Sequence, residues 1–346
     1  MLKLSRRVFG LTGAAALAAL AQPAARAQPR PENPKVTLAV ATHGALYDLP
    51  LTLAQQLNYF KAEGLETDLQ SMNGSARVQQ ALLSGSVDVV SGSYEQVLQL
   101  QAQGQKVQAF VLLLRSPMVS LGVSVKALPR YNAVAHLYGR RIGVSAPGSV
   151  THMLAHRLLM RSGMPASAVS FVGVGTGAGA VAALRTGQVD ALSNTEPVMT
   201  LLEQKGELRM VADARTQAGC ADLFGGPMPA GCLYATTQWL QKYPATAQAL
   251  ASSVVHALKW LQTAGPSDLI KTVPEAYMLG DRALYLASFN NVRDAIALDG
   301  MVPEAGPKIA LAALSDFDPS FKAERVELAK TFTNEFARRA KEKFKT

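Results

Sequence analysis

Small polar residues and a glycine gather where the chain leaves a short apolar run and enters a helical pattern. The run Ile142–Val144 leads into Ser145-Ala146-Pro147-Gly148-Ser149-Val150-Thr151, and a helix is expected to begin at Ser149. Free backbone N–H groups at a helix N-terminus attract anions, so this segment predicts a seat for an anionic group. Gly148 permits close approach of a ligand, and Ser149 and Thr151 can donate hydrogen bonds. The alternative is that Ser149 only caps its helix.

Other polar segments follow apolar runs in the same way. They are Gly74 and Ser75 before a helix of the first half, Ser91, Ser93 and Tyr94 after Val87–Val90, and Asn194, Thr195 and Glu196 after Val189–Leu192. Glu196 can bind an amino group of a ligand. Alternatively, it lies in the first turn of a helix, where carboxylates are favoured in any case.

A segment of the first half recurs in the second half, 102 positions later. Ala81-Leu82-Leu83-Ser84-Gly85-Ser86-Val87-Asp88-Val89-Val90-Ser91 resembles Ala183-Leu184-Arg185-Thr186-Gly187-Gln188-Val189-Asp190-Ala191-Leu192-Ser193. Each copy has the pattern of a helix end, a glycine stop, a short strand and a polar residue where the strand emerges. Asp88 and Asp190 stand at the start of their strands, far from a ligand, so we expect both to be structural.

Strands alternate with helices in both halves, which is typical of parallel sheets that bind ligands at the carboxyl ends of their strands. Beyond the Gly- and Pro-rich stretch 225–229 the pattern is helical to the C-terminus, which is too long for the second half alone. We therefore predict an α/β protein of two lobes, each a mostly parallel sheet flanked by helices. Lobe I would comprise residues 35–125 and 233–346, and lobe II, residues 126–232, would be inserted between them. Crossings near Ser124 and Tyr234 would form a hinge, with a cleft between the lobes.

Residue patterns for catalysis or metal binding are missing from the sequence. His152 and His156 form the one histidine pair at helical spacing, and no carboxylate shares their face. The glycine-rich run 175–179 lacks the lysine of a phosphate loop, and no Gly-x-Ser-x-Gly elbow occurs. We therefore expect no metal, no cofactor and no enzymatic activity.

The first 27 residues have the organisation of an export signal. Ser5-Arg6-Arg7-Val8-Phe9 precedes the apolar run Leu11–Ala21 and the small residues Ala25 and Ala27. The run is too short to cross a bilayer, so we expect cleavage after Ala27 and a periplasmic mature protein. The paired arginines resemble a twin-arginine signal, with an ordinary secretory signal as the alternative. Cleavage lowers the net charge from +9 to +5, which does not favour a nucleic-acid partner.

The chain contains two cysteines, Cys220 and Cys232, separated by residues rich in Gly and Pro that are typical of a surface loop. An oxidising compartment permits a disulfide between them. The alternative is a pair of small, semi-buried thiols.

Several tracts resemble the periplasmic solute-binding proteins of ABC importers, in the nitrate, sulfonate and taurine family that includes thiamine-precursor binders. The tracts are Pro50-Leu51-Thr52-Leu53-Ala54, Tyr59-Phe60-Lys61-Ala62-Glu63-Gly64-Leu65, Leu83-Ser84-Gly85-Ser86-Val87-Asp88, Gly139-Arg140-Arg141-Ile142-Gly143-Val144 and Gly187-Gln188-Val189-Asp190-Ala191. The resemblance implies a two-lobed type II periplasmic binding protein fold that closes over one small solute. It places binding segments at His43 to Asp48, which include Tyr47, and at Gly74 to Ala76, Ser91 to Tyr94, Pro147 to Thr151 and Asn194 to Glu196.

The sequence therefore predicts a monomeric periplasmic protein that captures a small, anionic organic solute, such as a sulfonate, a nitrate-like ion or a carboxylate. The resemblance implies delivery to an ABC permease in the inner membrane with its ATPase. One alternative is an enzyme of thiamine-pyrimidine synthesis on the same fold, although two cysteines are too few for the iron-binding segment that it would need. Another is a sensory ligand-binding subunit, which the sequence does not distinguish from a transport protein.

Overall fold

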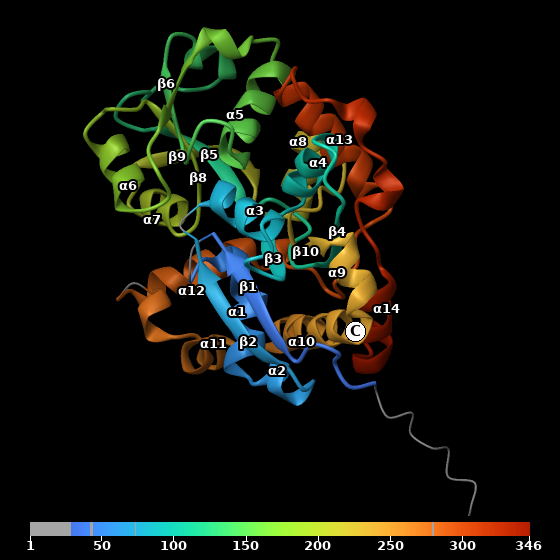
Figure 1. Cartoon of the computed structure of the whole chain (residues 1–346). Coiled ribbons are helices and arrows are strands. Elements are labelled where there is room, and N and C mark those ends of the chain that lie inside the picture. The colour runs from blue at the N-terminus through green and yellow to red at the C-terminus, as the bar shows by residue number, and fades with distance from the viewer. Residues whose placement is uncertain (1–28, 42–43, 73, 279) are drawn as a thin grey trace, which may run out of the picture. The chain divides into compact units, whose positions relative to one another are not determined.

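The computed structural model describes residues 29–41, 44–72, 74–278 and 280–346. The expected export signal and the candidate His43 lie outside these residues. Residues Pro31–Thr346 form one unit, separate from the residues that precede it. Two five-stranded sheets organise this unit (Figure 1).

The first sheet has the strand order β2-β1-β3-β10-β4. Strand β1 is parallel to both of its neighbours, whereas β10 is antiparallel to β3 and to β4. The strands are β1 (Lys35–Val40), β2 (Glu66–Ser71), β3 (Val89–Ser93), β4 (Val107–Leu112) and β10 (Gly231–Thr236). The central strands are apolar and buried, because helices cover both faces of a mostly parallel sheet.

The second sheet repeats this arrangement with the order β7-β6-β8-β5-β9. Its parallel strands are β6 with β7 and β8, and its antiparallel strand is β5. The strands are β5 (Val119–Ser124), β6 (Arg141–Val144), β7 (Ser170–Gly173), β8 (Ala191–Thr195) and β9 (Leu208–Ala214). The two sheets therefore share one topology, which the repeat in the sequence indicated.

In each sheet the antiparallel strand enters from the other half of the chain. Strand β5 follows β4 of the first sheet but pairs in the second, and β10 follows β9 of the second sheet but pairs in the first. Residues 119–124 thus lie in the second sheet, although the expected boundary at 125 assigned them to lobe I. Similarly, Gly231 and Cys232 lie in the first sheet, although they were assigned to lobe II. Hydrophobic pattern identifies a buried strand but not the sheet that it joins.

Helices surround both sheets. They are α1 (Leu49–Gln56), α2 (Tyr59–Ala62), α3 (Ser75–Leu83), α4 (Tyr94–Ala102), α5 (Val150–Arg161), α6 (Ala178–Arg185), α7 (Val198–Gln204), α8 (Gln217–Phe224), α9 (Thr237–Lys242), α10 (Pro244–Thr263), α11 (Pro266–Thr272), α12 (Arg282–Val292), α13 (Gly306–Phe317) and α14 (Glu335–Phe344), with short 3-10 turns that include η1 (Leu46–Asp48) and η4 (Glu275–Met278). Within the described residues, none of these helices has the length and apolar character that a bilayer crossing requires.

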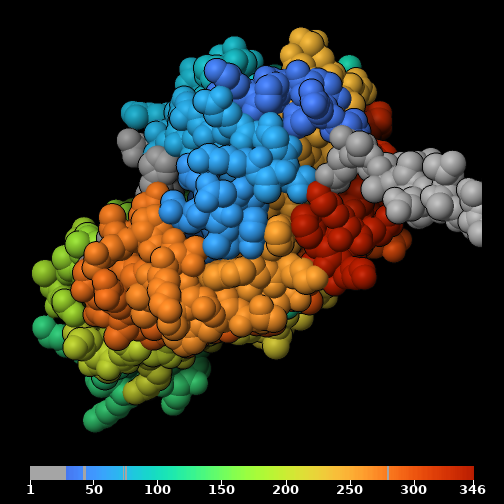
Figure 2. All heavy atoms as spheres, turned by 90° about the horizontal axis from the view of Figure 1, so that it is seen from below, coloured from blue at the N-terminus to red at the C-terminus, as the bar shows by residue number. Residues whose placement is uncertain are grey.

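The C-terminal helices pack on the first sheet, and some of them also contact helices that flank the second sheet. Helix α10 packs against α1, α2 and α14, and the blue N-terminal residues lie beside the orange and red C-terminal ones in Figure 2. Helix α12 contacts α7, and α13 contacts both α4 and α5. Segments from the end of the chain therefore contact helices that flank both sheets.

The two copies of the repeat have the same local structure. Gly85 and Gly187 both have a positive φ, 73° and 75°, where they end α3 and α6. The Asp88 carboxylate accepts a hydrogen bond from the Thr37 backbone N–H at 2.9 Å, and Asp190 accepts one from the Arg141 N–H at 2.9 Å. Each aspartate thus ties its own strand to the start of the neighbouring one, which confirms the structural role predicted for both.

Candidate functional site

Two neighbouring cavities lie at the carboxyl ends of the parallel strands. The Glu95 chamber, of about 290 Å³, is lined by Ala41, Tyr47, Asp48, Gln79, Ser91, Gly92, Ser93, Glu95, Gln96, Gln99, Gly148, Ser149, Val150, Met153, Leu314 and Phe317. The Tyr277 chamber, of about 460 Å³, is lined by Ala41, Gly44, Ala45, Leu46, Tyr47, Asp48, Met118, Thr176, Thr195, Glu196, Pro197, Ala276, Tyr277, Met278, Asp281, Leu284, Tyr285 and Val292. They share Ala41, Tyr47 and Asp48, and each is lined by residues in or after strands of both sheets.

Asp48 lies at the boundary of the two chambers. It ends the 3-10 turn η1, which follows β1, and it is 6 % exposed. The Ser91 hydroxyl, in β3, donates a hydrogen bond of 2.5 Å to Asp48 Oδ1. Burial raises the pKa of Asp48 to about 7, against the lowering effect of this hydrogen bond. The neighbouring strands β1 and β3 thus place a carboxyl and a hydroxyl side by side at the edge of the sheet.

Glu95 is the second buried acid of the Glu95 chamber. It lies in the first turn of α4 and is 6 % exposed, and neither of its carboxylate oxygens makes a hydrogen bond among the described residues. Burial raises the pKa of Glu95 to about 7, although its own backbone N–H and the Ser93 hydroxyl are close enough to lower it. The N-terminus of α4 favours a carboxylate here, but it does not replace the hydration that Glu95 has lost.

Tyr47 lies with these acids and is also without a partner. Its buried hydroxyl makes no hydrogen bond among the described residues. Burial raises the pKa of Tyr47, and the nearby Glu95, Cys232, Asp48 and Tyr234 raise it further. Tyr47, Asp48, Ser91 and Glu95 therefore form a polar cluster, the Glu95 cluster, whose acceptors exceed its donors.

The predicted anion seat at the start of α5 does border the Glu95 chamber, through Gly148, Ser149 and Val150. The Ser149 hydroxyl accepts a hydrogen bond of 3.4 Å from the His152 N–H and so caps the helix. Thr151 is buried, and its hydroxyl accepts from the Ser145 N–H at 2.9 Å. Both hydroxyls thus hold the turn that precedes α5.

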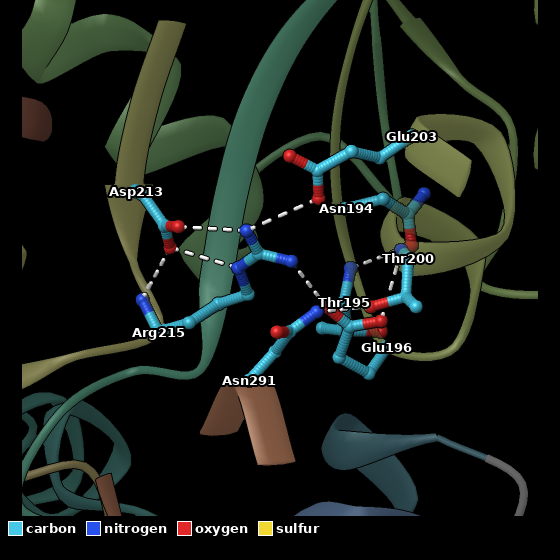
Figure 3. Close-up of polar contacts among 8 residues, drawn as sticks. All are labelled: Asn194, Thr195, Glu196, Thr200, Glu203, Asp213, Arg215 and Asn291. Carbon is cyan, nitrogen blue, oxygen red and sulfur yellow. Dashed lines mark hydrogen bonds and ion pairs between the residues drawn. The ribbon is translucent and has the colours of Figure 1, made fainter. Parts of the chain in front are cut away.

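Among the polar residues at the end of β8, Glu196 pairs with an arginine (Figure 3). Glu196 Oε1 pairs with Arg215 at 2.7 Å, and Glu196 Oε2 accepts a hydrogen bond of 3.0 Å from the Thr200 N–H. Arg215 also pairs with Asp213 at 2.7 Å and with Glu203 at 3.5 Å. We call Glu196, Glu203, Asp213 and Arg215 the Arg215 cluster. Both carboxylate oxygens of Glu196 and all three guanidinium nitrogens of Arg215 therefore have partners within the protein.

The other predicted site residues divide into those that line a chamber and those that do not. Tyr47, Asp48, Ser91, Ser93, Gly148, Ser149, Thr195 and Glu196 line one. Gly74, Tyr94, Pro147, Thr151 and Asn194 are absent from both linings, and the Ser75 side chain lies outside the described part of the chain. Tyr94 is buried and its hydroxyl contacts Thr331, while the Asn194 amide donates to the Gly175 carbonyl at 2.9 Å.

Sequence reasoning missed two groups of lining residues. Glu95 and Gln96 follow the predicted Tyr94 in the first turn of α4, where an acid is commonly only a helix-stabilising residue. Tyr277, Met278 and Tyr285 come from the C-terminal segment, which was expected only to complete lobe I. An acid directly after a candidate strand end is the one sequence signal that pointed to Glu95.

Of the two alternatives for Cys220 and Cys232, a disulfide or two thiols, the disulfide is not formed, since both thiols are free and buried. The segment between them is not a surface loop: it contains the end of α8 and the start of β10. Cys232 lies in β10, between β3 and β4, and Cys220 Sγ donates to the Gly226 carbonyl at 3.8 Å. Helix and sheet pairing therefore hold each thiol in buried surroundings.

Neither chamber has a cationic side chain or a metal site among the residues described. The described linings contain Asp48, Glu95, Glu196 and Asp281 but no lysine, arginine or histidine. No group of three or more His, Cys, Asp or Glu residues is placed to hold a metal ion within the described ranges. The charged side chains of the described linings are therefore all acidic, beside neutral polar and apolar ones.

Comparisons with known proteins agree with this architecture. The family model described as NMT1/THI5 like matches residues 46–264. A solved structure of a Bordetella bronchiseptica RB50 protein is 47 % identical, with a TM-score of 0.84 over 92 % of this chain and 100 % of that chain.

More distant structures share the fold. The alkanesulfonate-binding protein SsuA of Xanthomonas axonopodis pv. citri, bound to MOPS, is 20 % identical with a TM-score of 0.68, covering 89 % of this chain and 99 % of its own. The periplasmic nitrate-binding protein NrtA of Synechocystis PCC 6803 is 14 % identical with a TM-score of 0.67, covering 91 % and 90 %. These neighbours are binding proteins, and the predicted periplasmic binding protein fold is confirmed. By the extent of the family match, the chain belongs to the NMT1/THI5-like family.

Proposed function

We propose that this protein is the solute-binding component of an ABC importer, which captures a small molecule between two lobes and delivers it to a membrane permease. The observation that carries the proposal is the cleft itself. Two sheets of the same strand order place their carboxyl ends around one pair of chambers, and both sheets contribute lining residues. Ligands bind at such strand ends in open α/β sheets.

Contacts between the halves support a closing motion. Asn291 of α12 donates a hydrogen bond of 2.7 Å to Thr200 of α7, and Arg157 of α5 pairs with Asp316 of α13 at 2.7 Å. These contacts would break on opening, while the segments 113–118 and 215–230, which connect the sheets, would act as the hinge. The described structure would then correspond to the closed form.

We further propose that residues 1–27 are removed on export, that the mature protein is periplasmic and monomeric, and that it is not an enzyme. N-terminal sequencing of the protein from its host should begin at Gln28. A mature protein that retains Ser5 to Phe9 would contradict the proposed cleavage.

The test of function starts with native mass spectrometry of freshly purified mature protein. We expect a co-purified small molecule that is released on unfolding. Re-addition of this molecule should reduce the radius of gyration in small-angle scattering and raise the melting temperature, because ligand binding to the native state stabilises it.

Transport is then tested in vesicles that contain the permease and ATPase encoded nearest to the gene. Uptake of the identified molecule should require this protein. A protein that binds no small molecule and keeps one radius of gyration would contradict the proposal. Conversion of the molecule to a product would favour the enzyme, and binding without uptake would favour the sensory subunit.

A further inference from the structure

We propose that the cleft binds a solute with a cationic head, an amine or an amidine, carried on an apolar body. This inference rests on the proposed solute-binding function and specifies its ligand. It departs from the anionic solute that the sequence favoured.

The first support is the set of unused hydrogen-bond acceptors in the Glu95 chamber. Glu95 is more than nine-tenths buried, and both its oxygens lack a partner among the described residues. Asp48 has the Ser91 hydroxyl on Oδ1, and no described group donates to Oδ2. A buried carboxylate without a partner is costly, so a ligand that donates N–H groups here would supply what the protein does not.

The second support is the charge of the chamber. No lysine, arginine or histidine belongs to the described lining, and Arg215 nearby is already paired with three carboxylates. A sulfonate or carboxylate head would therefore lie next to two acids without a balancing cation. A cationic head would instead form charge-assisted hydrogen bonds with both.

The third support is the apolar space beside the acids. The Tyr277 chamber shares Tyr47 and Asp48 with the Glu95 chamber, and most of its further lining is apolar, including Met118, Tyr277 and Tyr285. Aromatic and thioether side chains in a cavity of this size suit a flat or aliphatic group. A head at the acids thus has room for its body on the other side of Asp48.

Helix α5 adds neutral hydrogen-bond donors on the far wall. Its first residues, Ser149 and Val150, line the Glu95 chamber together with Gly148. Backbone N–H groups at this helix start can take a ring nitrogen, a hydroxyl or a carbonyl of the solute. The same molecule would then donate to the first-sheet acids and accept from the second-sheet helix, which favours lobe closure.

Three probes of nearly the same shape separate the effect of charge from that of size: benzamidine, benzamide and benzoate. Their binding to mature protein at pH 8 is measured by ligand-observed NMR and calorimetry. We expect benzamidine to bind at least tenfold more tightly than benzoate, with benzamide between them. A preference for benzoate, or no binding of benzamidine up to 10 mM, would overturn the proposal.

Substitution of the acids then tests their role. Glu95→Gln and Asp48→Asn should each lower the ratio of benzamidine to benzamide affinity towards one. Glu324→Gln removes the same charge from an exposed position and should leave the preference unchanged. An unchanged preference in both cleft variants would also overturn the proposal.

The pH dependence provides an independent readout. The titratable groups that surround Glu95 are Tyr47 and Asp48 of η1, Tyr94 of α4, Cys220 of α8 and Cys232 of β10. Both acids have a pKa raised to about 7 by burial, so binding of a cation near pH 7 should release protons. Affinity for benzamidine, which stays charged, should therefore fall between pH 8 and pH 5. Binding that does not vary with pH would contradict the contact with the acids.

Failure of this inference is distinguishable from failure of the proposed function. If the co-purified molecule is an anion that compacts the protein, the binding function stands and the cationic head is wrong. If no molecule binds and the protein does not compact, the binding function itself fails.

Discussion

The Glu95 cluster and the Arg215 cluster lie at equivalent edges of two sheets with the same topology, but their acids have different partners. In the Arg215 cluster the guanidinium is 6 % exposed and the Glu196 carboxylate 2 %, and the two groups pair at 2.7 Å. In the Glu95 cluster two acids of similar burial have only the Ser91 hydroxyl, on Asp48, and the nearby Ser93 hydroxyl, beside Glu95, and no described cation pairs with either acid. The second sheet thus balances its buried charge internally, while the first leaves charge unbalanced next to a cavity.

The difference indicates a division of roles. Paired buried charges hold neighbouring segments in register, because loss of either partner leaves the other unpaired. Unpaired buried acids reduce stability, and such a feature persists at sites where a ligand supplies the missing partner. By this criterion the acids beside the first sheet recognise the ligand, and the paired charges at the end of the second sheet keep that side of the cleft rigid.

The largest expected effect comes from removing the central arginine of the Arg215 cluster. Arg215→Met leaves Glu196 buried without its partner and should lower the free energy of unfolding by about 3 to 5 kcal/mol. Urea denaturation at pH 7.5 measures the change. Arg282→Met breaks an exposed pair with Glu275 and should change stability by less than about 1 kcal/mol. Equal effects of the two substitutions would remove the distinction between the clusters.

Glu95→Gln should have the opposite sign. The pKa of Glu95 is raised from 4.5 to about 7 in the folded protein, so its ionisation opposes folding fully above pH 7 and not at all well below pH 4.5. The variant should therefore be more stable than the parent by about 3 kcal/mol at pH 8. This gain should fade as the pH falls through 7 towards 4.5.

Urea denaturation of both proteins across this pH range measures the effect. Glu324→Gln provides the control at an exposed site and should show no such pH-dependent gain. A Glu95→Gln variant that is destabilised at pH 8 would mean that Glu95 has a stabilising partner in the ligand-free protein.

A smaller effect on stability is expected at the contact between α12 and α7. Asn291→Ala removes the hydrogen bond to Thr200 and should lower stability by about 1 kcal/mol. If closure depends on this contact, the radius of gyration of the ligand-free variant should also increase. Asn290→Ala alters an exposed neighbour on the same helix and should do neither.

The smallest expected effect tests the edge of the Arg215 cluster. Glu203 lies 3.5 Å from Arg215 and its side chain is 41 % exposed, so Glu203→Gln should lower stability by less than about 0.5 kcal/mol. Thermal unfolding followed by circular dichroism measures it. A loss of stability comparable to that of Arg215→Met would mean that the pair with the exposed Glu203, rather than the pair with Glu196, stabilises the fold.

The sequence allowed much of the fold to be predicted, because the repeat marks equivalent helix ends and strand starts. Gly85 and Gly187 end their helices with the same backbone conformation, and Asp88 and Asp190 accept equivalent backbone hydrogen bonds. Pattern could not show that β5 and β10 exchange sheets, since a buried apolar run looks the same in either.

The site was predicted less completely, because local sequence does not reveal which polar groups find partners. Thr151 and Asn194 were expected to bind solute, but backbone groups of the surrounding turns take up their hydrogen-bonding capacity. Glu95 was passed over since a carboxylate in a first helical turn needs no further explanation. Only the surrounding structure shows that this carboxylate lacks a partner.

The exchange of strands has a consequence for how the polypeptide is made. Sheet one has a gap between β3 and β4 until β10 arrives, and β10 ends at Thr236. A ribosome must therefore have translated about two thirds of the message before that sheet can close, and pairings over such separations slow folding. A fragment confined to residues 126–232 would lack β5 and leave β8 and β9 with unpaired edges. Neither half is therefore an independent folding unit. Exchange of one half between related proteins would require β5 and β10 to be exchanged with it.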